Sequence, residues 1–199
     1  MSRRAVFCDR DGTLVEEHPY LHQPELVALL PGVAAALSRL ARAGFALVVV
    51  TNQAGVARGL YGEDAVERVH RRLRALLAAR RVTLDGVYHC PHLAEGVVAA
   101  YARACRCRKP APGMLEAAAR DLGLDVAGSY LVGNDPVDVG AARAAGAAPL
   151  FVTTGQAAGR PPPSGVPAFP SLAAAADAVL GSPTRRAPVP SRGPGRPLG

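Results

Sequence analysis

Ala5-Val-Phe-Cys-Asp-Arg-Asp-Gly-Thr13 is the stretch of sequence that decides the fold, because an apolar run of strand length leads directly into two carboxylates and a glycine. Residues two apart in an extended chain point the same way, so Asp9 and Asp11 can face one pocket. Gly12 permits a sharp turn after them. Two carboxylates in one pocket repel each other unless a cation lies between them or one is protonated. Oxygen ligands of this kind suit Mg²⁺, so the stretch predicts a magnesium site at the end of a first strand, residues 5–8.

Strands and helices alternate along the rest of the chain. Apolar runs predict further strands at residues 45–50, 86–89, 129–132 and 149–152. Helical spacing of apolar residues, with glycines at helix ends, predicts helices at residues 33–43, 63–81, 113–122, 136–145 and 172–180. This alternation predicts a single α/β domain of Rossmann type, with helices on both faces of a parallel sheet. In such sheets the ligand binds at the carboxyl ends of the strands, where the polar motifs of this chain fall.

Length and composition limit the classes of protein to consider. The 199 residues are enough for one domain with a sizeable core, which we place at residues 1–180. No apolar run reaches the ~20 residues of a membrane helix, and the first residues lack the pattern of a signal peptide, so we expect a cytoplasmic protein without membrane contact.

The formal net charge of +7 depends strongly on the end of the chain. Residues 181–199 are rich in Pro and Gly, contain no acid, and hold Arg185, Arg186, Arg192 and Arg196. This composition predicts a disordered, solvated basic tail. An arm that binds nucleic acid is the alternative, and we consider it the weaker interpretation.

Polar side chains also follow the second predicted strand. Thr51, Asn52 and Gln53 offer a hydroxyl and two amides, which are neutral groups suited to phosphate oxygens, although alone they would read as an ordinary polar loop. Further along the chain, Lys109 can supply a point charge to a phosphate, and Arg108 can bind one through its planar fork. These residue types favour a phosphorylated ligand.

Three cysteines and a histidine occur in two close pairs. Cys90 with His92 and Cys105 with Cys107 match a tetrahedral Cys₃His zinc site in the loop at residues 90–107. Free thiols are the alternative, since disulfides are rare in a reducing cytosol. Four protein ligands leave no open position, so we interpret the zinc as structural and expect it to position the residues that follow. The remaining histidines, which have no partner pattern and are assigned no role, are His18, His22, His70 and His89.

These motifs together resemble the haloacid dehalogenase (HAD) superfamily of phosphatases. The similarity covers residues 5–155 and is greatest to the D-glycero-D-manno-heptose 1,7-bisphosphate phosphatases and their histidinol-phosphate phosphatase relatives. The motifs that carry it are Asp9-Arg-Asp-Gly-Thr, Val50-Thr-Asn-Gln-Ala-Gly-Val-Ala-Arg-Gly, Tyr88-His-Cys-Pro-His and Cys105-Arg-Cys-Arg-Lys-Pro-Ala-Pro-Gly-Met. The resemblance implies a Mg²⁺-dependent phosphatase for a small sugar phosphate, with no large cap domain. Heptose bisphosphate, hydrolysed at the 7-phosphate, is the first candidate substrate, and we favour a monomer.

The resemblance also implies roles for individual residues. Asp9 would be the nucleophile, forming an aspartyl-phosphate, and Asp11 would be the general acid and then the general base. The Asp9 side chain and the Asp11 backbone carbonyl would hold Mg²⁺. Thr51 and Lys109 would stabilise the transferred phosphoryl group. The residues expected to contact the rest of the substrate are Glu17, Tyr20, Asn52, Gln53 and Arg108.

One motif departs from the family pattern. Members of the family carry Gly-Asp-Lys after the fourth strand, where this chain has Gly133-Asn134-Asp135-Pro136. This leaves three possibilities: Asn134 ligates Mg²⁺ in place of a carboxylate, Asp135 takes over that role, or metal binding is impaired. Asp135 also suits the N-cap of a helix that begins at Pro136, and Asp138 would support the site one turn further on. We predict that Asn134 stays at the metal and that its neutral amide weakens the affinity for Mg²⁺.

Two alternatives to heptose bisphosphate hydrolysis remain at the level of sequence. One is hydrolysis of histidinol phosphate, because no motif specifies the substrate. The other is a catalytically silent phosphosugar-binding protein, which the altered Gly-Asn-Asp suggests and the intact Asp9 and Asp11 oppose.

Overall fold

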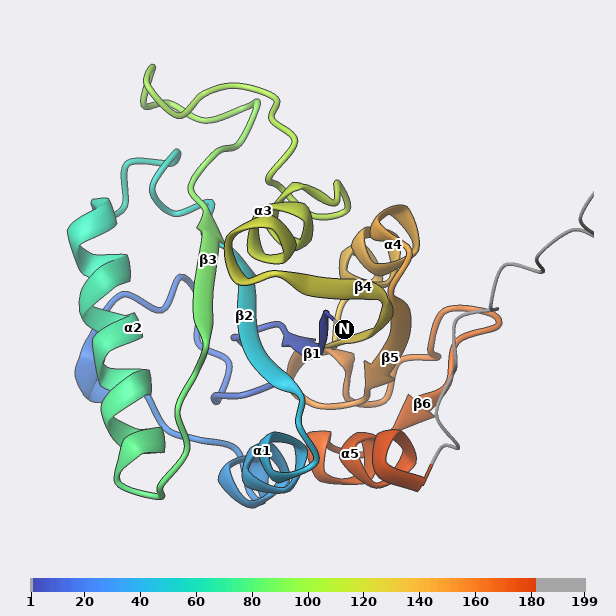
Figure 1. The fold of residues 1–199 in the computed structure, drawn as a ribbon. Coiled ribbons are helices and arrows are strands. Elements are labelled where there is room, and N and C mark those ends of the chain that lie inside the picture. The colour runs from blue at the N-terminus through green and yellow to red at the C-terminus, as the bar shows by residue number, and fades with distance from the viewer. Residues whose placement is uncertain (1, 182–199) are drawn as a thin grey trace, which may run out of the picture.

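Six parallel strands form one sheet in the order β3-β2-β1-β4-β5-β6 (Figure 1). The computed structural model describes residues 2–181, so the predicted basic tail lies outside the described residues except for Gly181. The strands are β1 Arg3–Cys8, β2 Ala46–Asn52, β3 Gly86–Cys90, β4 Leu124–Gly133, β5 Ala148–Val152 and β6 Ala168–Phe169. Phe7 of β1 pairs with Val48 on one side and with Leu131 on the other. The predicted parallel α/β sheet is confirmed.

Five helices cover the two faces of this sheet. They are α1 Val33–Arg42, α2 Glu63–Ala78, α3 Gly113–Leu122, α4 Pro136–Ala145 and α5 Leu172–Gly181. Successive residues of a strand point to opposite faces. Val6 and Cys8 therefore pack in the core formed with α1, α2 and α5, whereas Ala5 and Phe7 pack in the core formed with α3 and α4. Figure 1 shows α1 and α5 on one side of the strands and α3 and α4 on the other.

Two strands differ from the sequence-based expectation by more than two residues. Strand β4 begins at Leu124 rather than at residue 129, and its pairing with β1 shifts register between Arg4 and Val6. At this shift the Ser129 hydroxyl accepts a hydrogen bond from the backbone N–H of Ala5 at 2.8 Å, which keeps the irregular pairing satisfied. Strand β6 was not predicted, because Ala168–Phe169 is too short to show an alternating pattern.

The connections shape the carboxyl end of the sheet. No segment between the described strands and helices forms a separate cap domain, in agreement with the prediction. The longest connection without a helix or strand, residues 91–112, extends away from the sheet between β3 and α3 (Figure 1). Among the described residues no helix combines the length and apolar character needed to cross a membrane.

Candidate active site and metal cluster

A cavity of about 680 Å³ opens at the carboxyl ends of β1, β2 and β4. It is the place where a parallel α/β sheet binds its ligand. All of the residues predicted for the active site line it, although they come from distant parts of the sequence: Asp9, Asp11, Glu17, Tyr20, Thr51, Asn52, Gln53, Arg108, Lys109, Asn134 and Asp135. The fold therefore brings the predicted set together.

Lys109 is the centre of a buried charge network in this cavity. Its Nζ donates to Asp9 Oδ1 at 2.7 Å, to Asp138 Oδ1 at 2.6 Å and to the carbonyl oxygen of Val50 at 2.9 Å. Lys109 and Asp138 are almost completely buried, and Asp9 is 9% exposed. Asp138, which was predicted to support the site, thus contacts it through Lys109.

Burial and charge act in opposite directions on these groups. Burial raises the pKa of Asp9 to about 7, even though the positive charge of Lys109 partly offsets the effect. Burial alone would lower the pKa of Lys109, but the charges of Asp138 and Asp9 outweigh it and hold that pKa above its ordinary value. The ammonium is thus a fixed positive charge beside a carboxyl whose pKa burial raises. A divalent cation at Asp9 would favour its charged form, which is the form a nucleophile needs.

Asp11 lies at the same end of β1, and two residues hold its carboxylate. The guanidinium of Arg10 contacts both of its oxygens, and Gln53 Nε2 donates to Oδ2 at 3.0 Å. Gln53 Nε2 also donates to Thr51 Oγ1 at 2.9 Å. Because Gln53 is only 3% exposed and faces these partners, it supports Asp11 and Thr51 in this structure.

Asn52 forms a two-bond clamp on the backbone of Lys109. Its Oδ1 accepts from the Lys109 N–H at 3.0 Å, and its Nδ2 donates to the Lys109 carbonyl oxygen at 3.1 Å. The clamp joins the end of β2 to the loop that carries Lys109. The oxygen and one N–H of the Asn52 amide therefore bind the protein and hold this loop, while Asn52 also lines the cavity.

Asn134 follows β4, lines the same cavity as Asp9 and Asp11, and is 8% exposed. Its Nδ2 donates to the carbonyl oxygen of Thr154 at 3.2 Å and to Glu17 Oε2 at 3.4 Å. Its Oδ1 lies 3.4 Å from Thr13 Oγ1. The amide oxygen is thus turned away from the Glu17 carboxylate.

Asp135, unlike Asn134, caps the N-terminus of α4. Its Oδ1 accepts from the backbone N–H of Val137 at 2.9 Å, and Asp138 Oδ2 accepts from the Asp135 N–H at 3.1 Å, which together form a capping box at the start of α4. The N-cap interpretation of Asp135 is confirmed.

The donor set at the cavity fits a hard cation. Asp9 supplies a carboxylate, Asn134 an amide oxygen and Asp11 a backbone carbonyl, all oxygen ligands of the kind Mg²⁺ binds. Burial raises the pKa of Asp9, and a divalent cation bound beside this carboxyl would offset that effect by favouring its charged form.

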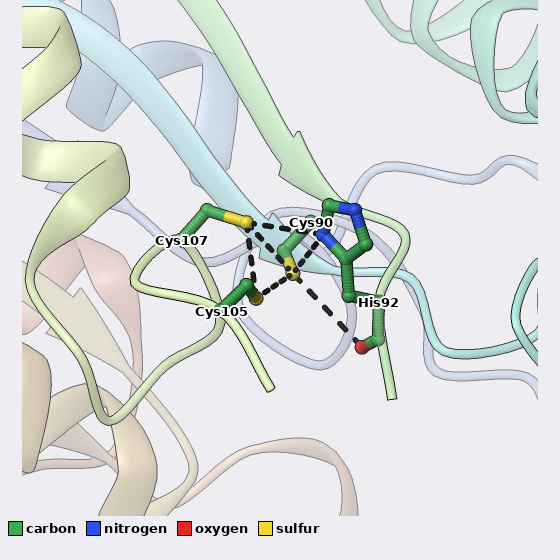
Figure 2. A group of neighbouring side chains, drawn as sticks. All are labelled: Cys90, His92, Cys105 and Cys107. Carbon is green, nitrogen blue, oxygen red and sulfur yellow. Dashed lines mark hydrogen bonds between the residues drawn. The ribbon is translucent and has the colours of Figure 1, made fainter. Parts of the chain in front are cut away.

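The three cysteines and the histidine predicted to bind zinc form a compact cluster beside the cavity (Figure 2). Cys107 Sγ lies 3.2 Å from the sulfur atoms of both Cys90 and Cys105, and 3.3 Å from His92 Nδ1. Cys90 Sγ lies 3.5 Å from Cys105 Sγ and 3.7 Å from His92 Nδ1. Ligands of one tetrahedral zinc ion lie roughly 3.4–3.8 Å apart, so the four donor atoms fit one metal ion.

His89 has a structural role that the sequence did not indicate. Its Nε2 lies 2.9 Å from Glu63 Oε2 of α2, and the hydroxyl of Tyr101 donates to Glu63 Oε1 at 2.7 Å. Glu63 thus ties both the end of β3 and the loop of residues 91–112 to α2. His70 is also structural, as it is 3% exposed within the core.

Sequence reasoning missed several other residues of the site. Arg10 is completely buried behind Asp11, and the hydroxyl of Tyr61 donates to Gln53 Oε1 at 3.2 Å. Gln156 and Arg160 line the cavity from the segment after β5. Of these residues, only Arg10 could have been found from the sequence. A charged residue between two carboxylates, directly after a buried strand, needs an ion-pair partner.

Comparisons with known proteins agree with this geometry. The HAD-hydrolase-like family model matches residues 106–175. The D-glycero-beta-D-manno-heptose-1,7-bisphosphate 7-phosphatase of Escherichia coli (strain K12) is 42% identical over 179 residues, covering 89% of this chain and 88% of that protein. The protein of the same name from Yersinia pestis is 45% identical over 141 residues, covering 71% of this chain and 75% of the relative.

Solved structures give the same result. The D,D-heptose 1,7-bisphosphate phosphatase from B. bronchiseptica, crystallised with magnesium and phosphate, is 34% identical with a TM-score of 0.78, covering 89% of this chain and 98% of that chain. The corresponding phosphatase from Burkholderia thailandensis is 28% identical with a TM-score of 0.65, covering 90% and 100%. With the cavity, the charge network and the Cys–His cluster in place, these similarities show that the chain belongs to the D-glycero-beta-D-manno-heptose-1,7-bisphosphate 7-phosphatase family of HAD-like hydrolases.

Proposed function

We propose that this phosphoric monoester hydrolase removes the 7-phosphate of D-glycero-beta-D-manno-heptose 1,7-bisphosphate through an aspartyl-phosphate at Asp9. One observation carries the proposal: Asp9 and Asp11 both line the cavity, with the ammonium of Lys109 2.7 Å from Asp9 Oδ1. The relatives described above, which are named for this substrate, support the choice of sugar.

The first step transfers the phosphoryl group to the protein. An oxygen of Asp9 forms a bond to phosphorus while the bond from phosphorus to the sugar oxygen breaks. Asp11 gives its proton to that leaving oxygen, so the sugar departs as a neutral alcohol. Lys109 and Thr51 stabilise the charge that develops on the phosphoryl oxygens.

The second step restores the free carboxylate of Asp9. Asp11, now ionised, takes a proton from a water molecule as its oxygen attacks phosphorus. The bond between phosphorus and the Asp9 oxygen breaks, and inorganic phosphate leaves. One carboxyl group therefore acts first as an acid and then as a base, and the protein ends the cycle with the proton back on Asp11.

Two metal ions belong to the proposal. Asp9, the backbone carbonyl of Asp11, and Asn134 would hold Mg²⁺, which when bound offsets the negative charge between a carboxylate and a phosphate. The Cys–His cluster would hold Zn²⁺ in a structural role, supported by its soft thiolate donors and by four protein ligands with no open position. Four cysteines without a disulfide also support a reducing, cytoplasmic location.

Residues at the mouth of the cavity would contact the remainder of the sugar phosphate. Arg108 lines the cavity and donates to the carbonyl oxygen of His92 at 3.3 Å. Its guanidinium is therefore held at the edge of the loop of residues 91–112, the Cys–His loop. Tyr20 is 45% exposed and faces the same cavity. Glu17 is fixed by the Gln156 N–H at 2.7 Å. Arg108 is suited to the second phosphate, while Tyr20 and Glu17 are suited to hydroxyl groups.

The test measures phosphate release from heptose 1,7-bisphosphate and from histidinol phosphate at the same Mg²⁺ concentration. We expect turnover of the heptose substrate, loss of turnover in Asp9→Asn, and acid-stable trapping of a phosphorylated native chain. Greater turnover of histidinol phosphate would change the substrate but keep the reaction. No turnover of either compound, with phosphosugar binding intact, would establish a silent binding protein instead.

A further inference from the structure

Arg10 stands between the two carboxylates of the Asp-Arg-Asp sequence, and its side chain is 0% exposed. A buried guanidinium is costly unless it is ion-paired and hydrogen-bonded. Its Nε lies 3.0 Å from Asp11 Oδ1, and its Nη2 lies 3.0 Å from Asp11 Oδ2. Nη2 also donates to the carbonyl oxygen of Leu21 at 3.4 Å. Among the described residues, Asp11 is the one carboxylate that forms a salt bridge with Arg10.

A second planar group holds the same carboxylate from a different element. Gln53, at the end of β2, donates to Asp11 Oδ2 at 3.0 Å, and the hydroxyl of Tyr61 donates to Gln53 Oε1 at 3.2 Å. Oδ2 therefore accepts two hydrogen bonds and Oδ1 accepts one. Since each carboxyl oxygen has two acceptor sites, Oδ2 is filled and Oδ1 keeps one site for a proton.

We propose that Arg10 is a positioning residue for proton transfer by Asp11. Its two-point contact fixes the rotation of the carboxyl group, so that Oδ1 is the oxygen that gives a proton to the leaving sugar oxygen and later takes one from water. Arg10 does not line the cavity, so it acts through Asp11 and not on the phosphate. This inference rests on the proposed phosphatase function and assigns a part of it that the family motif leaves open.

The competing explanation is that Arg10 only balances buried charge and keeps the chain folded. The two explanations differ in how they depend on the leaving group. A nitrophenolate leaves readily without protonation, whereas a sugar alkoxide needs a proton from a well-placed acid. Misplacing Asp11 should therefore harm the sugar phosphate more, while partial unfolding would harm both substrates equally.

The experiment compares kcat/KM for heptose 1,7-bisphosphate and for p-nitrophenyl phosphate in the native chain, in Arg10→Lys and in Arg10→Gln. This ratio reports the steps up to departure of the leaving group. General acid catalysis is typically worth about 10²–10⁴, so we expect Arg10→Lys to lose at least about tenfold more kcat/KM toward the sugar phosphate than toward p-nitrophenyl phosphate. Arg10→Gln should show a larger difference. If it fails to fold, Arg10→Lys, which keeps the charge but lacks the fork, decides the matter.

Arg3→Gln is the matched control. Arg3 pairs with Asp85 at 2.6 Å at the opposite end of β1 and takes no part in the cavity. The control should lower thermal stability without changing the ratio between the two substrates. Equal losses for both substrates in the folded Arg10→Lys chain would overturn the inference while leaving the phosphatase function in place. A native chain that hydrolyses neither compound would overturn the proposed function as well.

Discussion

Lys109 uses all three of its N–H donors inside the protein. They point to the carboxylates of Asp9 and Asp138 and to the carbonyl oxygen of Val50. A lysine on a flexible four-carbon stem would ordinarily sample many rotamers. Here the ammonium is confined before any substrate arrives, so little ordering remains to be done when a phosphoryl group binds beside it.

The neutral amide of Asn134 leads to a prediction about Mg²⁺. In Asn134→Asp, we expect the half-saturating Mg²⁺ concentration to fall by about tenfold, because a carboxylate adds negative charge to the ligand set. The new carboxylate would also face Glu17 and lose the donor that Nδ2 provides, so without Mg²⁺ the variant should be less stable by about 1 kcal/mol. Mg²⁺ titrations of activity and of thermal unfolding measure the two effects.

Asp135→Asn provides the check on this assignment. Asparagine is also a good N-cap, so the helix start is preserved while the charge is removed. We expect its Mg²⁺ dependence to match that of the native chain. A weaker response in Asp135→Asn, together with an unchanged half-saturating concentration in Asn134→Asp, would show that Asp135 serves the metal instead.

At the scale of the element, α2 carries a buried histidine that links stability to pH. Burial, reinforced by the charge of Arg10, lowers the pKa of His70 to about 2. In the unfolded chain a histidine binds a proton below a pH of about 6.5. In the folded chain His70 stays neutral until the pH is far lower. The unfolded state thus binds more protons in this window, and stability falls as the pH drops below about 6.5.

His70→Gln tests this linkage. Each pH unit below the unfolded pKa costs the native chain up to about 1.4 kcal/mol through this group, so at pH 5 the contribution reaches about 2 kcal/mol. Between pH 7.5 and pH 5 the free energy of unfolding should fall in both proteins. The fall should be about 2 kcal/mol smaller in the variant than in the native chain. Urea unfolding at the two pH values measures it. Equal losses in both proteins would contradict a neutral buried His70.

The Cys–His loop is a second element with its own prediction. Cys107→Ser removes the thiol that contacts all three other ligands, so we expect loss of the bound metal and loosening of residues 91–112. Turnover should fall by about tenfold or more, because Arg108 and Lys109 follow directly. Metal analysis, limited proteolysis and steady-state kinetics measure the three effects.

Cys8→Ala is the matched control for that substitution. Cys8 is a buried core residue of β1, and burial raises its pKa to about 12, so it remains a thiol. The Cys8→Ala chain should keep its bound metal, and residues 91–112 should stay protected from proteolysis. Full metal content in Cys107→Ser would show that the cluster does not need this ligand.

Much of the fold was predictable because its signals are local. Apolar runs marked five of the six strands, and every residue predicted for the active site lines the cavity. What sequence could not provide was the direction of individual side chains. The sequence suggests Asn52 and Gln53 as ligands of a phosphorylated substrate, but it does not show that their amides also bind Lys109 and Asp11. Such contacts join residues far apart in the chain, so no local pattern records them.

At the scale of the whole molecule, every residue within 2–181 that lines the cavity precedes position 162. Deleting residues 183–199 removes four arginines but none of these residues. We therefore expect the shortened chain to keep its kcat/KM within about twofold, with weaker retention on a cation-exchange column. A large loss of activity would assign a catalytic role to the basic tail. The preference for a monomer stays a prediction, and sedimentation of either chain measures it.

The amide clamp of Asn52 on the backbone of Lys109 has a consequence for how this scaffold can change. The Cys–His cluster and the clamp anchor the loop of residues 91–112 at both ends. Substitutions between these anchors can therefore change the loop without displacing the ammonium of Lys109. Such substitutions can admit other sugars at the mouth of the cavity, while the residues that carry out phosphoryl transfer stay in place.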